Sequence, residues 1–211
     1  MFRDIRPVLS ALLRNRTGAV LVGLQVAIAL AVLVNAVYIV KQRVDLIGRP
    51  TGLDVGNIFV LSSAGFTQDH DRYATMREDL AWLRSLPDVL AATSTNAIPL
   101  SGGGSSTGIA TTPEASSEQT VPMNYFQVDE DGLEALGVTL AAGRNFRADE
   151  ILPPDLNSDR AIPQVIITKA LARSLFKTDD AVGKVAYDAF GRPTTVIGVI
   201  EHMHGSWLSW D

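Results

Sequence analysis

The sequence contains no cysteine, so it can form no disulfide or thiolate metal site and offers no thiol nucleophile. A cysteine-free chain is compatible with both oxidising and reducing compartments, so this absence assigns neither. Histidine is scarce too, with three residues among 211. From the sequence we expect no catalytic residue, no bound metal and no cofactor.

Basic residues are few outside the N-terminal quarter of the chain. Residues 1–49 contain seven Lys/Arg against Asp4 and Asp45, a net charge of +5, whereas residues 50–211 carry a net charge of −10. A body this acidic repels phosphate backbones, so nucleic acid is not an expected partner. Basic residues that flank an apolar run indicate instead a membrane interface, with lipid as the partner.

That apolar run is Gly18–Val40, GAVLVGLQVAIALAVLVNAVYIV, and it contains no charge. As a helix with a rise of about 1.5 Å per residue, it is longer than the ~30 Å hydrocarbon core of a bilayer. A secretory signal has a shorter apolar region and a small-residue cleavage site, whereas Lys41 and Arg43 follow here. We predict an uncleaved transmembrane helix over residues 17–41; a signal peptide and a buried soluble helix are the alternatives.

Residues 1–16 precede this span and are predicted to form an amphipathic helix on the cytoplasmic face, because apolar residues recur at helical spacing with arginines between them. These apolar residues are Ile5, Val8, Leu9, Leu12 and Leu13. Four arginines precede the span and three basic residues follow it, a small difference that also favours a cytoplasmic N-terminus.

Small residues recur every fourth position along the span, and one polar residue continues the row. They are Ala19, Gly23, Ala27, Ala31 and Asn35. Small residues allow close helix approach, and an amide in lipid requires a polar partner. The row therefore indicates a packing face for other helices, the alternative being a chance recurrence of a common residue type.

After Pro50 the sequence is typical of a mixed α+β domain that contains βαβ units. Residues 42–56 are predicted to form a linker or a helix extension, and residues 57–211 an extracytoplasmic domain. Within that domain, residues 57–98 are predicted to form a βαβ lobe and residues 99–211 a second lobe.

The predicted βαβ lobe has strands at residues 57–63 and 89–97, which are rich in β-branched and apolar residues. Asp69 and Asp71 are candidate N-caps for the helix between these strands. The helix ends before Pro87, which cannot continue it.

The second lobe opens with a Gly/Ser-rich crossing at residues 99–108, which lacks the Gly-Lys-Ser/Thr ending of a phosphate loop. Strands interrupted by a polar turn follow. A short helix at Asp131–Leu136 is expected to end at Gly137, and the chain then extends again. The strand QVIIT leads into a helix capped by Thr168, and a hairpin turns near Gly191.

Two groups of residues, a histidine pair and an acidic run, allow both a structural and a functional interpretation. His202 and His204, with Glu201 beside them, have the spacing of a two-histidine metal pair on a strand, but no third ligand is evident and His70 is the one other histidine. We expect a structural loop here.

The acidic run VDEDGLE (residues 128–134) is expected to be the first turn of a helix, where carboxylates complement the macrodipole. A cation site is the alternative. We expect a structural role for Lys184 in VGKV.

Four segments occur in one order along the chain: LPDVLAATSTNAIPLSGGG, LEALGVTLAAGRNF, VIITKALARSLF with DDAVGKV, and TTVIGVIEHMHGSWLSW. In this order and spacing they resemble the periplasmic core domain of MacB-like ABC transporter permeases, which belong to the larger FtsX-like permease group. The resemblance covers nearly the whole chain.

The resemblance implies a permease-type subunit in the bacterial inner membrane, with its N-terminus in the cytoplasm and its C-terminal domain in the periplasm. It implies a separate ABC ATP-binding subunit, a second permease copy or homologue, and a periplasmic adaptor as partners. The implied role is to couple ATP-driven helix motion to the outer domain, for export or mechanotransmission. A membrane-tethered module that recruits a periplasmic protein is the alternative.

The chain departs from the family pattern at its C-terminal end. Family members continue past the position of Asp211 through the rest of the outer domain and three further membrane helices. We therefore expect a fragment or a truncated gene product, and an incompletely packed βαβ lobe at residues 57–98.

Overall fold

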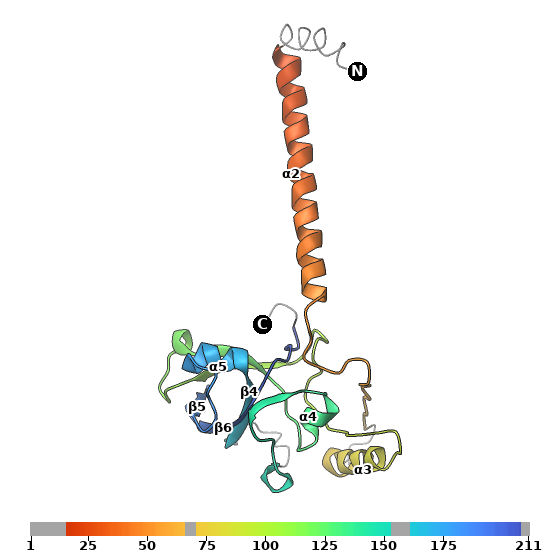
Figure 1. Cartoon of the computed structure of the whole chain (residues 1–211), viewed down its shortest axis with the longest axis vertical. Helices are drawn as coiled ribbons and strands as arrows, with labels where there is room; N and C mark the ends of the chain where they lie inside the picture. Colours follow the sequence, from red (N-terminus) through yellow and green to blue (C-terminus); the bar gives the residue numbers. More distant parts are fainter. Residues whose placement is uncertain (1–15, 66–70, 153–160, 208–211) are drawn as a thin grey trace. The chain divides into compact units, whose positions relative to one another are not determined.

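The computed structural model of the chain describes residues 16–65, 71–152 and 161–207 (Figure 1). The chain divides into two compact units, Met1–Arg49 and Pro50–Asp211. Each unit is described by itself below.

The first unit contains the helix α2, Arg16–Ile47, whose 32 residues bury no side chain within the unit. It includes the predicted span and continues for six residues beyond Lys41. Within the described residues, α2 is the one helix long and apolar enough to cross a membrane. The amphipathic helix predicted for residues 1–16 lies outside the described residues, apart from Arg16.

The second unit is built on a six-stranded sheet in which most neighbours are antiparallel. Its strands are β1 Ser105–Ala110, β2 Val121–Tyr125, β3 Leu140–Gly143, β4 Gln164–Thr168, β5 Val185–Asp188 and β6 Pro193–Ile200. The strand order is β2-β1-β5-β6-β3, and β4 pairs with β6 in the parallel direction. The prediction of a mixed α+β domain is confirmed.

The core lies between this sheet and the helix α5, Lys169–Phe176 (Figure 1). The hydroxyl of Thr168 caps α5 by accepting a hydrogen bond from the Leu171 amide at 3.1 Å. Ala172 and Leu175 face inward, so α5 is amphipathic. Its partners in the core include Ile109, Ile167, Ala181, Ala186, Val196 and Val199.

Several sequence predictions for the second lobe are confirmed. The strand QVIIT is β4, and Thr168 caps the following helix. The short helix α4, Gly132–Ala135, precedes a left-handed Gly137. The hairpin of β5 and β6 turns at Gly191, whose φ is 74°. Such left-handed positions favour glycine, which is why these turns were readable from sequence.

The predicted βαβ lobe is wrong in its strands. The helix α3, Arg72–Arg84, forms with Asp71 as its N-cap, but residues 57–63 and 89–97 form no strand. A strand needs a hydrogen-bonding neighbour as well as β-branched residues. The Gly/Ser-rich crossing is also shorter than expected, because β1 begins at Ser105.

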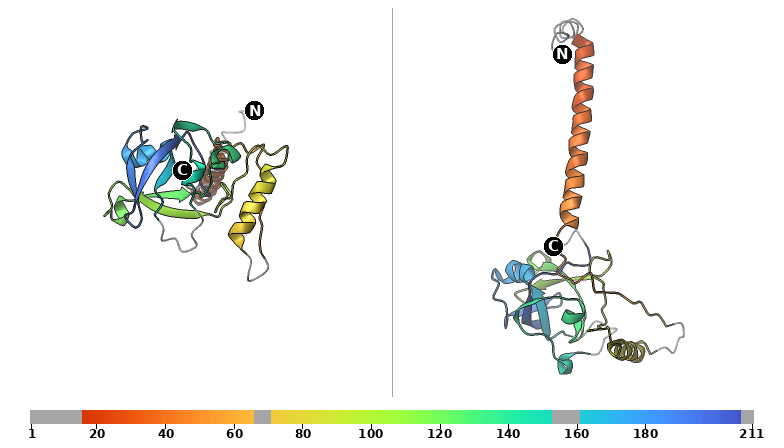
Figure 2. Two further views of the ribbon diagram at one scale, coloured as in Figure 1. Left: turned by 90° about the horizontal axis from the view of Figure 1, so that it is seen from below. Right: turned by 45° about the vertical axis from the view of Figure 1, so that its right-hand side comes forward.

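In the described part of residues 57–98, Ala97 is the one buried residue, so this segment is loosely packed, as expected. In both views of Figure 2, α3 lies beside the sheet and covers neither of its faces. The division of the outer domain into lobes at residues 98 and 99 stays a prediction.

A carboxylate connects the end of β3 to the start of β4. The guanidinium of Arg144 donates two hydrogen bonds to Glu150, each 2.7 Å long. The amide of Arg147 and the side chain of Gln164 donate to the same carboxylate at 2.9 and 3.2 Å. These hydrogen bonds, above all those from Arg144, lower the pKa of Glu150 from 4.5 to about 2.

The lowered pKa makes stability depend on pH. The folded state gains stability from ionised Glu150 above pH 4.5, and this gain is lost as the pH falls from 4.5 toward 2. We expect Glu150→Gln to lower the urea midpoint at pH 7 and to differ less from the unmodified chain at pH 3. Circular dichroism at pH 7, 4 and 3 measures this, with the exposed Glu118→Gln as control. A difference that is constant with pH contradicts the prediction.

Candidate functional site: a junction around helix α4

Residues Thr51–Asn57, here called the junction segment, are the part of the second unit that follows α2 in sequence. The amide of His204 donates a hydrogen bond to the carbonyl of Thr51 at 3.0 Å. Gly52, with φ of 76°, lies so close to His202 that an added Cβ would fall 2.1 Å from the His202 carbonyl oxygen. Glycine is therefore required here, and the junction segment is fixed against residues 202–204.

The junction segment also contacts the C-terminal end of α4. The amide of Asp54 donates to the carbonyl of Leu136 at 3.2 Å. A Cβ on Gly137, whose φ is 64°, would lie 2.4 Å from the Cβ of Asp54. Asn57 closes the turn by donating from its backbone and side chain to Asp54, at 3.0 and 2.9 Å. The backbone of α4 and that of the junction segment are thus in direct contact.

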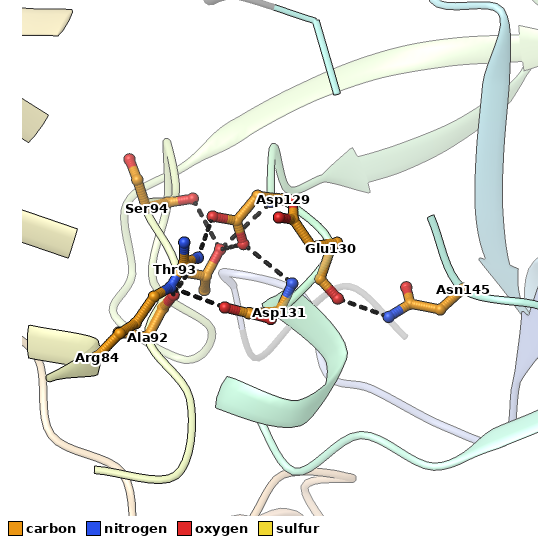
Figure 3. Close-up of polar contacts among 8 residues, drawn as sticks. All are labelled: Arg84, Ala92, Thr93, Ser94, Asp129, Glu130, Asp131 and Asn145. Atoms are coloured by element: carbon orange, nitrogen blue, oxygen red, sulfur yellow. Dashed lines mark hydrogen bonds and ion pairs between the residues drawn. The ribbon is translucent and has the colours of Figure 1, made fainter. Parts of the chain in front are cut away.

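The N-terminal side of α4 is held by polar contacts to two other parts of the fold. The side chain of Asn145, after β3, donates to the carbonyl of Glu130 at 2.7 Å (Figure 3). On the opposite side, α4 faces the end of α3 through Asp129 and Asp131. The residues that flank the short α4 therefore contact the junction segment, the chain after β3, and α3.

Arg84, the last residue of α3, makes the contact with Asp129 and Asp131 (Figure 3). Its Nη2 lies 2.6 Å from Asp129 Oδ2, and its Nε lies 2.7 Å from Asp131 Oδ2. Both nitrogens also donate to the carbonyl of Ala92, Nη2 at 2.7 Å and Nε at 3.0 Å. Asp129 accepts a further hydrogen bond from Thr93 Oγ1 at 2.7 Å. We call this set of contacts the Arg84 bridge.

These contacts bear on the alternative interpretation of the acidic run, residues 128–134, as a cation site. The carboxylates of Asp129 and Asp131 face a guanidinium, so in this structure the cation beside them is Arg84. The run does lead into a helical turn, as expected, although Asp131 makes no side-chain capping bond there. The clustered carboxylates do have a positively charged partner, Arg84, which lies 45 residues before Asp129 in the sequence.

The structure brings the two histidines together, and among the described residues it places no third candidate ligand with them. The rings of His202 and His204 have centroids 4.8 Å apart at an interplanar angle of 77°. Across the described ranges, no group of three or more His, Cys, Asp or Glu residues is placed to hold a metal ion. His70 lies outside those ranges. Glu201 pairs instead with Lys169, with Nζ and Oε1 2.5 Å apart.

The structure also places Lys184 and a Gly-x-Ser-x-Gly string of the sequence. The nitrogen Nζ of Lys184 lies 5.6 Å from the ring centroid of Phe176, which is a cation–π contact. The string GSSTG at Gly104–Gly108 has the Gly-x-Ser-x-Gly spacing, but Ser106 lies inside β1. A nucleophilic serine of that motif requires a strand-to-helix turn, so this string gives no hydrolase site.

The comparisons with known proteins agree with the arrangement of one apolar helix and an α+β domain. The sequence profile of the MacB-like periplasmic core domain matches residues 17–209, so the chain belongs to this family. It is a domain of permease-type proteins of ABC transporters. One apolar helix followed by this domain fits a single-pass membrane protein. A comparison with curated proteins gives no match.

Solved structures also resemble the chain. The extracellular domain of the ABC-type transporter YknZ from Gram-positive bacteria is 20% identical, over 64% of this chain and 65% of that one, with a TM-score of 0.41. The periplasmic region of MacB from Actinobacillus actinomycetemcomitans is 17% identical, over 76% of this chain and 67% of that one, with a TM-score of 0.44. The chain thus spans about two thirds of each solved domain.

The contact between Gly137 and Asp54 can be tested by adding one methyl group. Gly137→Ala adds left-handed strain of roughly 1–2 kcal/mol and a clash with Asp54, and overpacking costs about 1–3 kcal/mol more. Gly183→Ala is the matched control, because its φ is 82° but no atom lies within 4 Å of an added Cβ. We expect Gly137→Ala to destabilise the chain more than Gly183→Ala in urea unfolding. Equal losses for the two variants contradict the described contact.

Proposed function

We propose that the chain acts as a permease-type part of an ABC transporter, and that it couples ATP-driven motion of its membrane helix to an extracytoplasmic domain. In this proposal the coupling serves export or mechanotransmission. The family membership of residues 17–209 is the observation that carries this proposal.

The junction segment supports the proposal on physical grounds. Three residues, 48–50, separate the end of α2 from Thr51, so a displacement of α2 acts on the outer domain through a very short connection. The segment is then fixed by backbone hydrogen bonds to His204 and Leu136. A short connection that ends in fixed contacts transmits displacement better than a long flexible linker.

The partners follow from this role. ATP hydrolysis is assigned to a separate ABC ATP-binding subunit, and this chain is not the enzyme. A second permease copy or homologue packs against the row from Ala19 to Asn35, where small residues permit close approach. A periplasmic adaptor contacts the outer domain, and lipid surrounds α2.

We place the chain in the bacterial inner membrane, with residue 1 in the cytoplasm and the second unit in the periplasm. Because the chain lacks cysteine, single introduced cysteines report orientation without background. We expect a membrane-impermeant maleimide to label Glu114→Cys in intact spheroplasts and to label Ser10→Cys after permeabilisation. The reverse pattern, or a mature protein that begins after residue 40, contradicts the proposal.

The transporter role predicts a stable ATP-binding partner. We expect an affinity pull-down of the protein from its native membranes to recover an ABC ATP-binding subunit in a defined ratio. The matched control is a tagged inner-membrane protein of unrelated family at the same expression level. Recovery of no ATP-binding subunit, under conditions that keep other transporters intact, contradicts the transporter role.

A binding module that recruits a periplasmic protein is the second candidate, and exposed apolar residues near α3 favour it. Trp82 is 61% exposed and Leu90 is 91% exposed. Large exposed apolar side chains offer contact area to a partner protein. A complex with a periplasmic protein that forms equally well with and without ATP in membrane vesicles supports this second candidate over the first.

A further inference from the structure

Helix α3 and its flanking segments contribute no residue to the two buried core clusters of the second unit. The hydrophobic core consists of residues from the sheet, α5 and the loop that follows α5. In contrast, α3 buries no residue fully: Met76, Leu80 and Leu83 are half-buried, and Trp82 is mostly exposed. We call residues 71–92 the α3 arm. The position of the α3 arm must depend on contacts other than those of the core.

The Arg84 bridge is the polar attachment of the α3 arm to α4. Arg84 donates to the carbonyl of Ala92, at the C-terminal end of the α3 arm. It also pairs with the two carboxylates that precede α4. The side chains of Arg84, Asp129 and Asp131 are 33, 16 and 33% exposed, so water and salt reach the bridge. An attachment of this kind opens more readily than a packed apolar interface.

Helix α4 places the Arg84 bridge and the junction segment at its two ends. Asp131 is the N-cap of α4 and Leu136 is its C-cap. Asp131 contacts Arg84, while Leu136 accepts the hydrogen bond from Asp54 of the junction segment. The four residues of α4 thus separate the contact with α3 from the contact with the segment that follows α2. A displacement of the junction segment acts on α4 and, through α4, on the bridge.

We propose that the α3 arm is a movable part of the outer domain, and that the junction segment sets its position through α4 and the Arg84 bridge. Arg84 is a positioning residue in this arrangement. The inference deepens the proposed function and rests on it for the source of the displacement. The connection between junction segment, α4 and α3 arm is testable without any ATP-binding subunit.

The experiment measures the distance between the α3 arm and α5, which packs on the sheet, in the full chain in lipid nanodiscs. Spin labels are introduced as Glu78→Cys on α3 and Ser174→Cys on α5, both at exposed positions in a chain without native cysteine. Double electron–electron resonance then gives the distribution of distances between the labels. We expect one narrow distribution for the chain with the native bridge.

Arg84→Gln tests the bridge. We expect it to broaden the distance distribution at least twofold, since a neutral amide cannot hold two carboxylates. Arg192→Gln is the matched control, because Arg192 also pairs with an aspartate at 2.7 Å and is similarly exposed. Should Arg84→Gln fail to fold by circular dichroism, the near-isosteric Asp131→Asn takes its place. An unchanged distribution in the folded variant overturns the proposal.

Gly137→Ala tests the connection through α4. An added Cβ at Gly137 clashes with Asp54 of the junction segment, which is 30 residues from Arg84 in sequence. We expect Gly137→Ala to broaden the same distribution and Gly183→Ala to leave it unchanged. In the double variant Arg84→Gln with Gly137→Ala, the broadening should not exceed that of the larger single change. An unaffected α3 arm in Gly137→Ala, or fully additive effects, overturns the connection.

These outcomes are separate from the fate of the proposed function. If the pull-down recovers no ATP-binding subunit but both variants broaden the distribution, the connection through α4 stands and the source of the displacement is wrong. If the ATP-binding subunit is recovered but the α3 arm does not respond to Gly137→Ala, the transporter role stands and the α3 arm is not its moving part.

Discussion

The pairing of β6 with three other strands is the constraint on which the second unit depends. β6 pairs with β4 on one side, and with β5 and β3 on the other. Its Val196 and Val199 are fully buried beneath α5. The chain that leaves β6 then passes Thr139, to which the Glu201 amide donates, and reaches Thr51 through His204. The junction segment is therefore positioned by the most firmly held strand of the domain.

Sequence patterns predicted the parts of the fold whose interactions are local. Thr168 caps α5 by accepting from the amide of Leu171, three residues ahead, and Gly137 ends a helix that begins five residues earlier. Each of these sequence signals therefore lies within a few residues of the structure it predicts. The strands predicted at residues 57–63 and 89–97 required a distant neighbour. Side-chain preference alone supplies no hydrogen-bonding partner, and these segments stay irregular.

The candidate site was predictable only in fragments. The acidic run before α4 was predicted to be the first turn of a helix, with a cation site as the alternative. Arg84 reaches these carboxylates because of the turn that the chain makes between α3 and Ala92. The hydrophobic pattern of the sequence does not predict that turn. The contact of Gly52 with His202 spans 150 residues, and a glycine that permits close approach looks in sequence like any other turn glycine.

The two ends of α4 differ in the kind of force that holds them, and this difference gives the proposed motion its direction. At the junction segment, backbone hydrogen bonds and glycines in close contact leave no room for sliding, so displacement there moves the whole turn. At Arg84, partly exposed ion pairs contribute roughly 0–1 kcal/mol each and are screened by salt. A displacement of the junction segment therefore moves α4, and the contacts with Arg84 at the other end of α4 are the ones that break. The α3 arm, which has no core of its own, is the part that moves.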